Sequence, residues 1–483
     1  MARNSLADAC GRLVGQIDEA LAQLPAAASD VLTVVKDMLG APPDLVVRSV
    51  SPHVHLMFFE TTVDQARVEQ AVLQPLARSP DANTFAAQVS NVRTYGEAVH
   101  ALLQAQVLLV RAGTILSTSM DSWPHRDPSE PPSEIVPQGP HTGFVENLQA
   151  NIALIRQRIR DPRLRWRRLS VGSRSHNPAA LVYMQDLARD ELVADVEERA
   201  RQARPSFVTD SSMLEEWLTR VSGLLFPTME STERPDVATA ALLEGRVLIL
   251  VDGSPVAVIA PTVFAYLIQT PMDYYNRSFD AVLKRVIRLG ALFASLLVSP
   301  LFVAVITINQ ELIPGRLFVS IAQTRLGVPL PAVGEVLLME VVVEMVREAG
   351  MRMPGAVGQT VSIVGAIVIG QSAVMAGLIS APVVVVVSLA YIASTVVPSL
   401  DGRVALRALR FPLIALAAVF GLFGLVWGLM LLFLYLLALE SFGVPYLAPV
   451  APHRARGLQD TIRRLPLTDL RRNFMARRKV KHE

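Results

Sequence analysis

Hydrophobic and polar positions divide the chain into two halves. Up to about residue 288 charged residues recur every few positions, whereas residues 289–440 are mostly apolar. In the first half, 44–50 and 53–60 alternate like β-strands, and 62–78 has the spacing of a helix. The pattern predicts a soluble N-terminal α/β region followed by an α-helical polytopic membrane domain.

The soluble half contains an internal repeat. ALLQAQVLLVRAGTIL (101–116) matches ALLEGRVLILVDGSPV (241–256) in phase at an offset of 140. Both stretches predict a helix end, a buried strand, a glycine turn and a second strand. A strand and a helix at 179–203 likewise repeat 53–78. We therefore expect a polar leader at 1–30, a first α/β lobe at 31–120, and a related second lobe with a coupling segment at 165–285.

A connector at 121–164 separates the predicted lobes. Six prolines lie between 124 and 140, and proline fixes φ and removes a backbone donor, which favours an extended chain. After the prolines, 144–161 has the pattern of an amphipathic helix with basic residues toward its C-terminus.

The apolar half, at 286–445, predicts four membrane spans. A bilayer core about 30 Å thick needs about 20 helical residues. Segments 289–309, 357–378 and 382–399 meet this length, and the chain should fold back near 380–382. The segment 411–439 is expected to form one long, tilted span.

A charged stripe complicates the element at 317–350. At helical spacing, three glutamates four residues apart share one face with two arginines: Glu340, Glu344, Glu348, Arg347 and Arg352. Three carboxylates at a bilayer centre would cost about 8–10 kcal/mol on insertion scales. We expect an amphipathic or re-entrant element whose stripe faces a pore entrance, arginine partners or water, the last as a simple interfacial helix.

The span 357–378 carries a stripe of small and weakly polar residues. At spacings of three and four its members are Gln359, Ser362, Ala366, Gly370, Ala373 and Gly377. Small residues favour close helix packing, and a pore also needs a lining of small, uncharged side chains. Both interpretations stay open, and they agree if several subunits meet around this helix.

Charges near the spans give conflicting orientations. Lys284, Arg285 and Arg288 favour a cytoplasmic side before the first span, and a basic tail at 446–483 favours the same side for the C-terminus. With four spans, Arg403, Arg407 and Arg410 would then lie in an outside loop, against the positive-inside tendency.

No pattern indicates catalysis, a cofactor, a metal site or nucleic-acid binding. The chain lacks a phosphate-binding loop, zinc-ligand spacing and a nucleophile elbow. Cys10 is the only cysteine, so no disulfide forms within the chain, and His53 with His55 has no nearby carboxylate or thiol partner. Asp252-Gly253 predicts a hairpin.

Several long motifs resemble the GerA family of spore germination proteins, the A-type subunits of nutrient germinant receptors. They include TERPDVATAALLEGRVLILVDGSP, QTPMDYYNRS, REAGMRMPGAVGQTVSIVGAIVIGQSAV and SFGVPYLAPVAP, and the resemblance covers roughly residues 35–470. One departure lies at Gln138 and His141, where the family usually places basic residues on either side of the Gly-Pro.

The resemblance implies a protein of the spore inner membrane, in contact with lipid. Together with the predicted spans and the charges beside them, we expect a multi-pass protein with both terminal regions facing the cytoplasm. It implies a homo-oligomeric ring that forms a nutrient-gated cation channel. The partners would be a B-type transporter-like subunit and a C-type lipoprotein subunit.

The matching motifs also imply a region that couples the soluble and membrane parts. Its residues in this chain are Glu233, Arg234, Asp236, Glu244 and Arg246. Ion pairs among them would transmit the opening signal, or would simply hold one lobe together. Alternatives for the whole chain are a stage-V sporulation paralogue, a secondary transporter and a non-conducting receptor scaffold.

Overall fold

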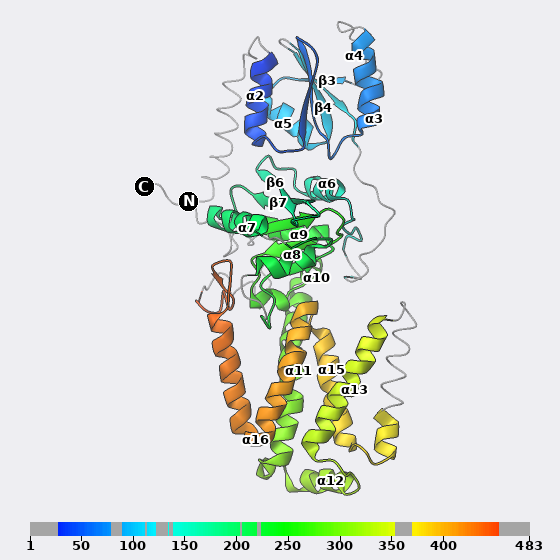
Figure 1. Cartoon of the computed structure of the whole chain (residues 1–483), viewed down its shortest axis with the longest axis vertical. Coiled ribbons are helices and arrows are strands. Elements are labelled where there is room, and N and C mark those ends of the chain that lie inside the picture. The colour runs from blue at the N-terminus through cyan, green and yellow to red at the C-terminus, as the bar shows by residue number, and fades with distance from the viewer. Residues whose placement is uncertain are drawn as a thin grey trace. The chain divides into compact units, whose positions relative to one another are not determined.

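The computed structural model describes residues 28–78, 89–111, 114–121, 134, 139–202, 205–219, 224–352 and 370–453. These residues form two compact units (Figure 1). Unit 1 holds the described residues up to 219 together with Met229–Pro261, and unit 2 holds 224–228 and 262–453.

The first lobe of unit 1 is a five-stranded antiparallel sheet with helices on both faces. Its strands are β1 (Leu45–Ser51), β2 (Val54–Phe59), β3 (Val89–Val92), β4 (Gln106–Arg111) and β5 (Thr114–Ser119), in the order β1-β2-β4-β5-β3. Its helices are α2 (Ala28–Leu39), α3 (Gln65–Val68), η1 (Glu69–Leu73), α4 (Gln74–Arg78) and α5 (Tyr95–Leu103).

Strand β2 shows why this lobe needs helices on both faces. Successive side chains of a strand point to opposite sides. Met57 and Phe59 pack in the core under α2 and α5, whereas Leu56 and Phe58 pack under α3, η1 and α4. All four side chains are buried, so the strand is apolar at both alternating sets of positions.

The second lobe repeats the first. Its sheet has the equivalent order β6-β7-β9-β10-β8, with β6 (Leu164–Val171), β7 (Asn177–Met184), β8 (Glu230–Thr232), β9 (Val247–Val251) and β10 (Ala257–Ala260). Its helices are α6 (Leu148–Arg158), α7 (Asp190–Gln202), α8 (Ser211–Leu218) and α9 (Pro235–Leu243). The matching strand order confirms the predicted pair of related α/β lobes.

Helix α6 belongs to the second lobe, although the sequence analysis placed it in the connector. Its apolar residues Leu148, Ile152 and Ile155 lie in the same core as Trp166 of β6 and Leu242 of α9. In this way α6 pairs with α9 as α2 pairs with α5 in the first lobe. Asp252, at the β9–β10 hairpin, accepts a hydrogen bond from the α6 backbone at 3.0 Å.

Unit 2 is a bundle of apolar helices. It contains α10 (Met272–Tyr275), α11 (Ser278–Thr307), η3 (Gln310–Leu312), α12 (Gly315–Arg325), α13 (Ala332–Arg352), α15 (Ala381–Val396), α16 (Leu400–Ala438) and a short hairpin of β11 (Glu440–Ser441) and β12 (Val444–Pro445). Helices α11 and α16 are long and apolar enough to cross a membrane, and α15 is a shorter apolar helix.

Helix α16 is not the single tilted span that we expected over 411–439. Gly421 has φ +60° and ψ −141°, which breaks the helix into two arms that fold back on each other (Figure 1). Residues with a Cβ rarely adopt this conformation, and Asn309 Oδ1 accepts a hydrogen bond from Leu422 N at 2.9 Å, capping the returning arm. Because Gly421 lies inside an uncharged run, hydropathy alone does not reveal the reversal.

Contacts fix the direction in which each helix runs through the bundle. We call the end where α11 begins proximal and the end where it finishes distal. At the distal end Glu335 of α13 contacts Ser380, which precedes α15, and Asn309 contacts the break in α16. At the proximal end Arg407 of α16 meets Glu344 of α13. Helices α13, α15 and the second arm of α16 therefore run from distal to proximal, opposite to α11 and the first arm.

Candidate functional site

The predicted coupling residues form two separate ion pairs at the edge of the second lobe. The buried Arg234 guanidinium donates to both oxygens of Asp236, at 3.1 and 2.7 Å. Its Nη1 donates to the carbonyl oxygen of Glu134 at 3.4 Å, and Nη2, which also binds Asp236, donates to that of Pro140 at 3.3 Å. Arg234 thus attaches described residues of the connector to the lobe.

Arg246 pairs with a residue that the sequence analysis did not single out. Its guanidinium donates to Glu230 of β8 at 2.6 Å and to the carbonyl of Pro261 at 2.9 Å. Pro261 ends unit 1, so Arg246 holds the strand end from which the chain leaves that unit. The other two predicted residues flank α9: Glu233 precedes it and Glu244 is its C-terminal cap.

Glu134 is a half-buried carboxyl group beside these pairs. It accepts hydrogen bonds from the Thr232 hydroxyl at 3.0 Å and from the backbone of Glu233 at 3.3 Å. Burial raises the pKa of Glu134 to about 7, and the two hydrogen bonds offset only part of that effect. The connector contact is therefore sensitive to pH near neutrality.

The glutamate stripe of α13 faces a different environment at each of its three positions. Glu340 is buried. It accepts one hydrogen bond from Arg410 of α16 at 2.6 Å and another from the Ser299 hydroxyl of α11 at 2.7 Å. This pair joins three helices that are far apart in sequence. The sequence analysis missed both partners, although Arg403, Arg407 and Arg410 are spaced to share one helical face.

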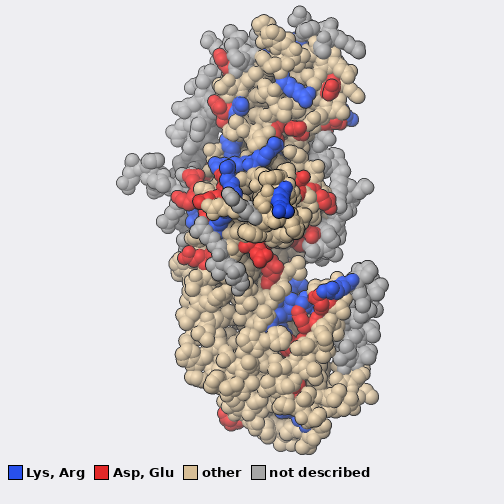
Figure 2. All heavy atoms as spheres, viewed as in Figure 1, with Lys and Arg blue, Asp and Glu red and all other residues tan. Residues whose placement is uncertain are grey.

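The next two glutamates are progressively more exposed. Glu344 binds Arg347 of its own helix and lies 3.4 Å from Arg407 Nε. Glu348 pairs with Arg352 at 2.9 Å, and both side chains are largely in the open. The stripe therefore runs from the bundle interior to its surface, and Figure 2 shows charged side chains gathered near the C-terminal end of α13 on an otherwise mostly uncharged unit.

Three further carboxylate contacts of unit 2 fix its helix ends. Asp273, fully buried, binds Arg285 at 3.0 Å and Arg288 at 2.8 Å. Two of the cations that we used to orient the first span are thus also structural partners. At the distal end, Glu335 accepts from both the backbone and the hydroxyl of Ser380, which anchors the start of α15.

The small-residue stripe is described only in part. Gln359, Ser362 and Ala366 lie outside the described residues. Gly370 is buried, and a Cβ added there would meet Val384 of α15 at 3.5 Å; Ala373 packs in the bundle core. Gly377 lies in the turn after the helical segment, with φ +66°, so it does not continue the stripe.

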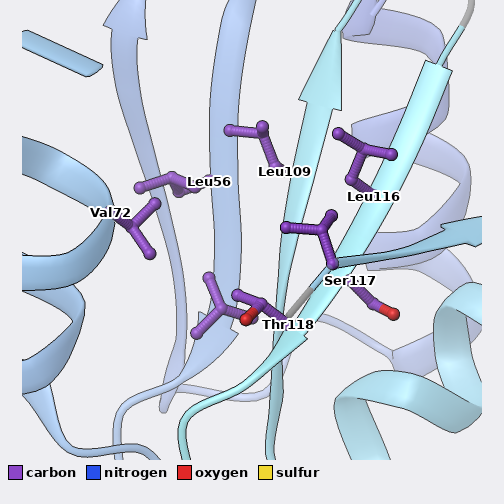
Figure 3. Close-up of a pocket in the computed structure, with 8 residues that line it drawn as sticks. Leu56, Val72, Leu109, Leu116, Ser117 and Thr118 are labelled. Atoms are coloured by element: carbon purple, nitrogen blue, oxygen red, sulfur yellow. The ribbon is translucent and has the colours of Figure 1, made fainter. Parts of the chain in front are cut away.

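A small cavity lies beneath η1 of the first lobe. Val72 of η1, Leu56, Leu109 and Leu116 line it with Thr118 (Figure 3). Its volume is about 10 Å³, roughly the minimum for one water molecule. This space is too small for a nutrient molecule.

A buried ion pair joins the two lobes of unit 1. Asp44, before β1, accepts two hydrogen bonds from Arg156 of α6, at 2.9 and 2.8 Å. Trp166 of β6 and Thr61 also donate to Asp44, at 2.9 and 2.8 Å, and the guanidinium lies 4.2 Å from the Phe59 ring centroid. The carboxylate is fully satisfied, so the lobes are held together at this point.

Comparisons with known proteins give relatives along most of the chain. It is 36% identical over 462 residues to spore germination protein KA of Bacillus subtilis (strain 168), covering 92% of this chain and 85% of that protein. It is 34% identical over 430 residues to spore germination protein B1 of the same strain, covering 86% and 89%. It is 32% identical over 461 residues to spore germination protein GerLA of Bacillus cereus, covering 92% of this chain and 94% of that protein.

The chain is also similar to a solved structure. It is the crystal structure of the N-terminal domain of the A subunit of the Bacillus megaterium spore germinant receptor GerK3, at 25% identity and a TM-score of 0.39. The match covers 50% of this chain and 97% of that one. Residues 33–475 also match the family described as Bacillus/Clostridium GerA spore germination protein. As its motifs predicted, the chain belongs to the GerA family of spore germination proteins.

Proposed function

We propose that the chain is the A-type subunit of a spore germinant receptor and oligomerises into a nutrient-gated cation channel. The observation that carries the proposal is the family match over 33–475, which spans both the α/β lobes and the helical bundle. The receptor would include a B-type transporter-like subunit and a C-type lipoprotein subunit, and cation release through the channel would start germination.

The bundle would lie in the spore inner membrane as a multi-pass domain. Its helix directions support a topology in which the charges beside the spans no longer oppose one another. With α13 crossing the bundle and α16 folded into two arms, Arg403, Arg407 and Arg410 lie at the proximal end, where the chain arrives from unit 1. The proximal side would then be cytoplasmic, in agreement with the positive-inside tendency and with the basic tail.

The channel would form where several copies meet. Pairing of Glu340 with Arg410 inside the bundle supports a domain that buries its charges against its own helices rather than lipid. Because Gly370 is buried beside α15 and Ala373 packs against the bundle core, we assign these two to helix packing. For Gln359, Ser362 and Ala366, which lie outside the described residues, we retain the pore-lining interpretation of the sequence.

Coupling between the soluble and membrane parts would involve the Arg234–Asp236 and Arg246–Glu230 pairs. Both pairs are internal to the second lobe, and Arg246 also holds Pro261, from which the chain continues into unit 2. A movement of the connector or of β8 would therefore be passed directly to the segment that leads into the bundle.

The test uses spores whose only copy of this subunit is altered. Ser362→Trp should block nutrient-triggered potassium release while subunit abundance stays normal. Val385→Trp is the control, since Val385 is 66% exposed on the bundle surface, and it should leave release unchanged. Normal release from Ser362→Trp spores would contradict the lining role, and nutrient-triggered release in spores without the subunit would contradict the receptor role.

A further inference from the structure

The first arm of α16 carries more positive charge than its neighbours neutralise. We define the arginine face as Arg403, Arg407 and Arg410, which recur at spacings of four and three and so share one side of the helix. The facing helix α13 adds a fourth cation, Arg347. Among the described residues, the ion pairs of these four cations go to two carboxylates of α13, Glu340 and Glu344.

Arg410 takes up one of these carboxylates but is itself incompletely bonded. Its side chain is 3% exposed and its partner Glu340 is 6% exposed. Beyond Glu340, its hydrogen-bond partner among the described residues is the Ala390 carbonyl, at 3.3 Å. In the described part of the chain its buried Nε atom has no hydrogen-bond partner. Leaving a buried charged donor unbonded is costly.

The other carboxylate is shared. Glu344 is hydrogen-bonded to Arg347 and also lies 3.4 Å from Arg407 Nε. That Nε contact is not a hydrogen bond, and the Arg407 side chain is only 13% exposed. Two guanidinium groups thus depend on a single carboxylate.

Arg403 is left without a carboxylate among the described residues. Its one hydrogen bond is to the Pro398 carbonyl at 3.4 Å, and its Nε is buried and unbonded. It also lies in the first turn of the helix, where the backbone dipole disfavours a cation. Asp401 of the same turn forms no ion pair within the described ranges.

We propose that the arginine face binds the phosphate of an anionic phospholipid, through Arg403 and Arg407. Guanidinium groups bind phosphate oxygens through paired hydrogen bonds, and these two have donors to spare. A lipid fits better than a free anion because α16 exposes Leu400 and Val404 on the same turns, at 54% and 56%. The arginine face would then lie at the headgroup level of the proximal leaflet.

The test measures thermal unfolding of the full chain in detergent, titrated with short-chain phosphatidylglycerol. The rise of the unfolding midpoint with lipid concentration gives an apparent affinity for the lipid. We expect Arg403→Gln/Arg407→Gln to weaken that affinity about thirtyfold, the effect of two cations near a lipid surface. The lysine pair Arg403→Lys/Arg407→Lys should lose only a few-fold, because the charge remains.

A matched control is Arg168→Gln/Arg174→Gln, which removes the same charge from exposed positions of unit 1 and should bind like the wild type. If the double glutamine variant does not fold, Arg403→Gln alone should still show a clear loss, since Arg403 has no ion pair to break. Equal affinity in wild type and variant overturns the proposal. So does an equal response to inorganic phosphate or to short-chain phosphatidylcholine.

This inference rests on the proposed membrane location, but the two can fail separately. A wild-type chain that needs detergent for extraction and shows no headgroup preference refutes the lipid site and leaves the channel proposal intact. A chain that is soluble without detergent refutes the membrane location itself.

Discussion

Two buried ion pairs, one in each unit, illustrate different uses of charge. In unit 1, Asp44 accepts four hydrogen bonds and Arg156 also lies over an aromatic ring. In unit 2, Arg410 has one carboxylate partner, one long carbonyl contact and an unbonded Nε.

The difference separates an ion pair that holds two elements firmly together from one whose arginine can still bind another group. A fully bonded pair strongly opposes separation of the groups that it joins. We therefore expect the two lobes of unit 1 to move as one body. The incompletely bonded arginine face has donors available for a new partner, which makes it the better candidate for a contact that changes when a ligand binds.

Removing Arg156 should have the largest effect. Arg156→Met leaves the buried Asp44 carboxylate without its cation, and loss of one partner of a buried pair costs about 3–5 kcal/mol of unfolding free energy. Hydrogen exchange of β1 and β6 in the full chain would measure the loss. Arg201→Met, which removes a partner of Glu197 from a 67% exposed site, should change exchange by less than about 0.5 kcal/mol.

Removing Glu340 should cost somewhat less, about 2–4 kcal/mol. Glu340→Leu leaves Arg410 buried without its anion, whereas Glu340→Leu/Arg410→Met removes both charges and should recover most of the stability. Thermal unfolding in detergent would report both variants. A double variant as unstable as the single one would show that the pair does not act as a unit, and the comparison between the two pairs would fail.

The reversal in α16 should depend on its glycine. Gly421→Ala places a Cβ against Asn309 Oδ1 in a backbone conformation that alanine avoids, at a cost of about 1–3 kcal/mol. Gly290 of α11 is the matched control, because a Cβ there meets nothing within 4 Å. Gly290→Ala should be neutral or stabilising by up to about 1 kcal/mol. Equal thermal stability of the two variants would contradict the break at Gly421.

The smallest effect should be a dependence of the unfolding free energy on pH, caused by Glu134. With its pKa raised to about 7, the folded chain holds a proton that the unfolded chain releases from about pH 4.5 upward. The stability from this group is present at low pH and is lost as pH rises through 7. Between pH 5.5 and 8.5 the loss should be about 1–2 kcal/mol, measured by hydrogen exchange of β8.

Glu134→Gln keeps a neutral side chain and should remove this dependence. The exposed Glu191→Gln should retain the wild-type slope. If the stability of Glu134→Gln fell with pH as steeply as that of the wild type, another group would be responsible for the dependence.

The duplicated lobes were predictable because their signals are local. Strand alternation, the glycine turns and the in-phase match of 101–116 with 241–256 each occupy a short stretch of sequence. The structure confirms them through the equivalent strand orders. Family membership was likewise predictable from long contiguous motifs, and the family match confirms it.

The long-range contacts were not predictable in the same way. Glu340 and Arg410 are 70 residues apart, and Asp44 and Arg156 are 112 apart. No local pattern specifies which cation will meet which carboxylate across a bundle or between lobes. The break at Gly421 was not predicted for a related reason. A chain reversal that involves no charged residue and no proline leaves the hydropathy profile unchanged.

The central proposal is that the chain crosses a membrane with the arginine face on the side where α11 begins. Single cysteines in a Cys10→Ser background test it directly: Phe207→Cys in unit 1, Leu326→Cys at the distal end and Leu400→Cys at the proximal end, all at exposed positions. An impermeant maleimide should label Leu400→Cys and Phe207→Cys from one side of sealed vesicles and Leu326→Cys from the other. Labelling of Leu400→Cys from the same side as Leu326→Cys would contradict the account.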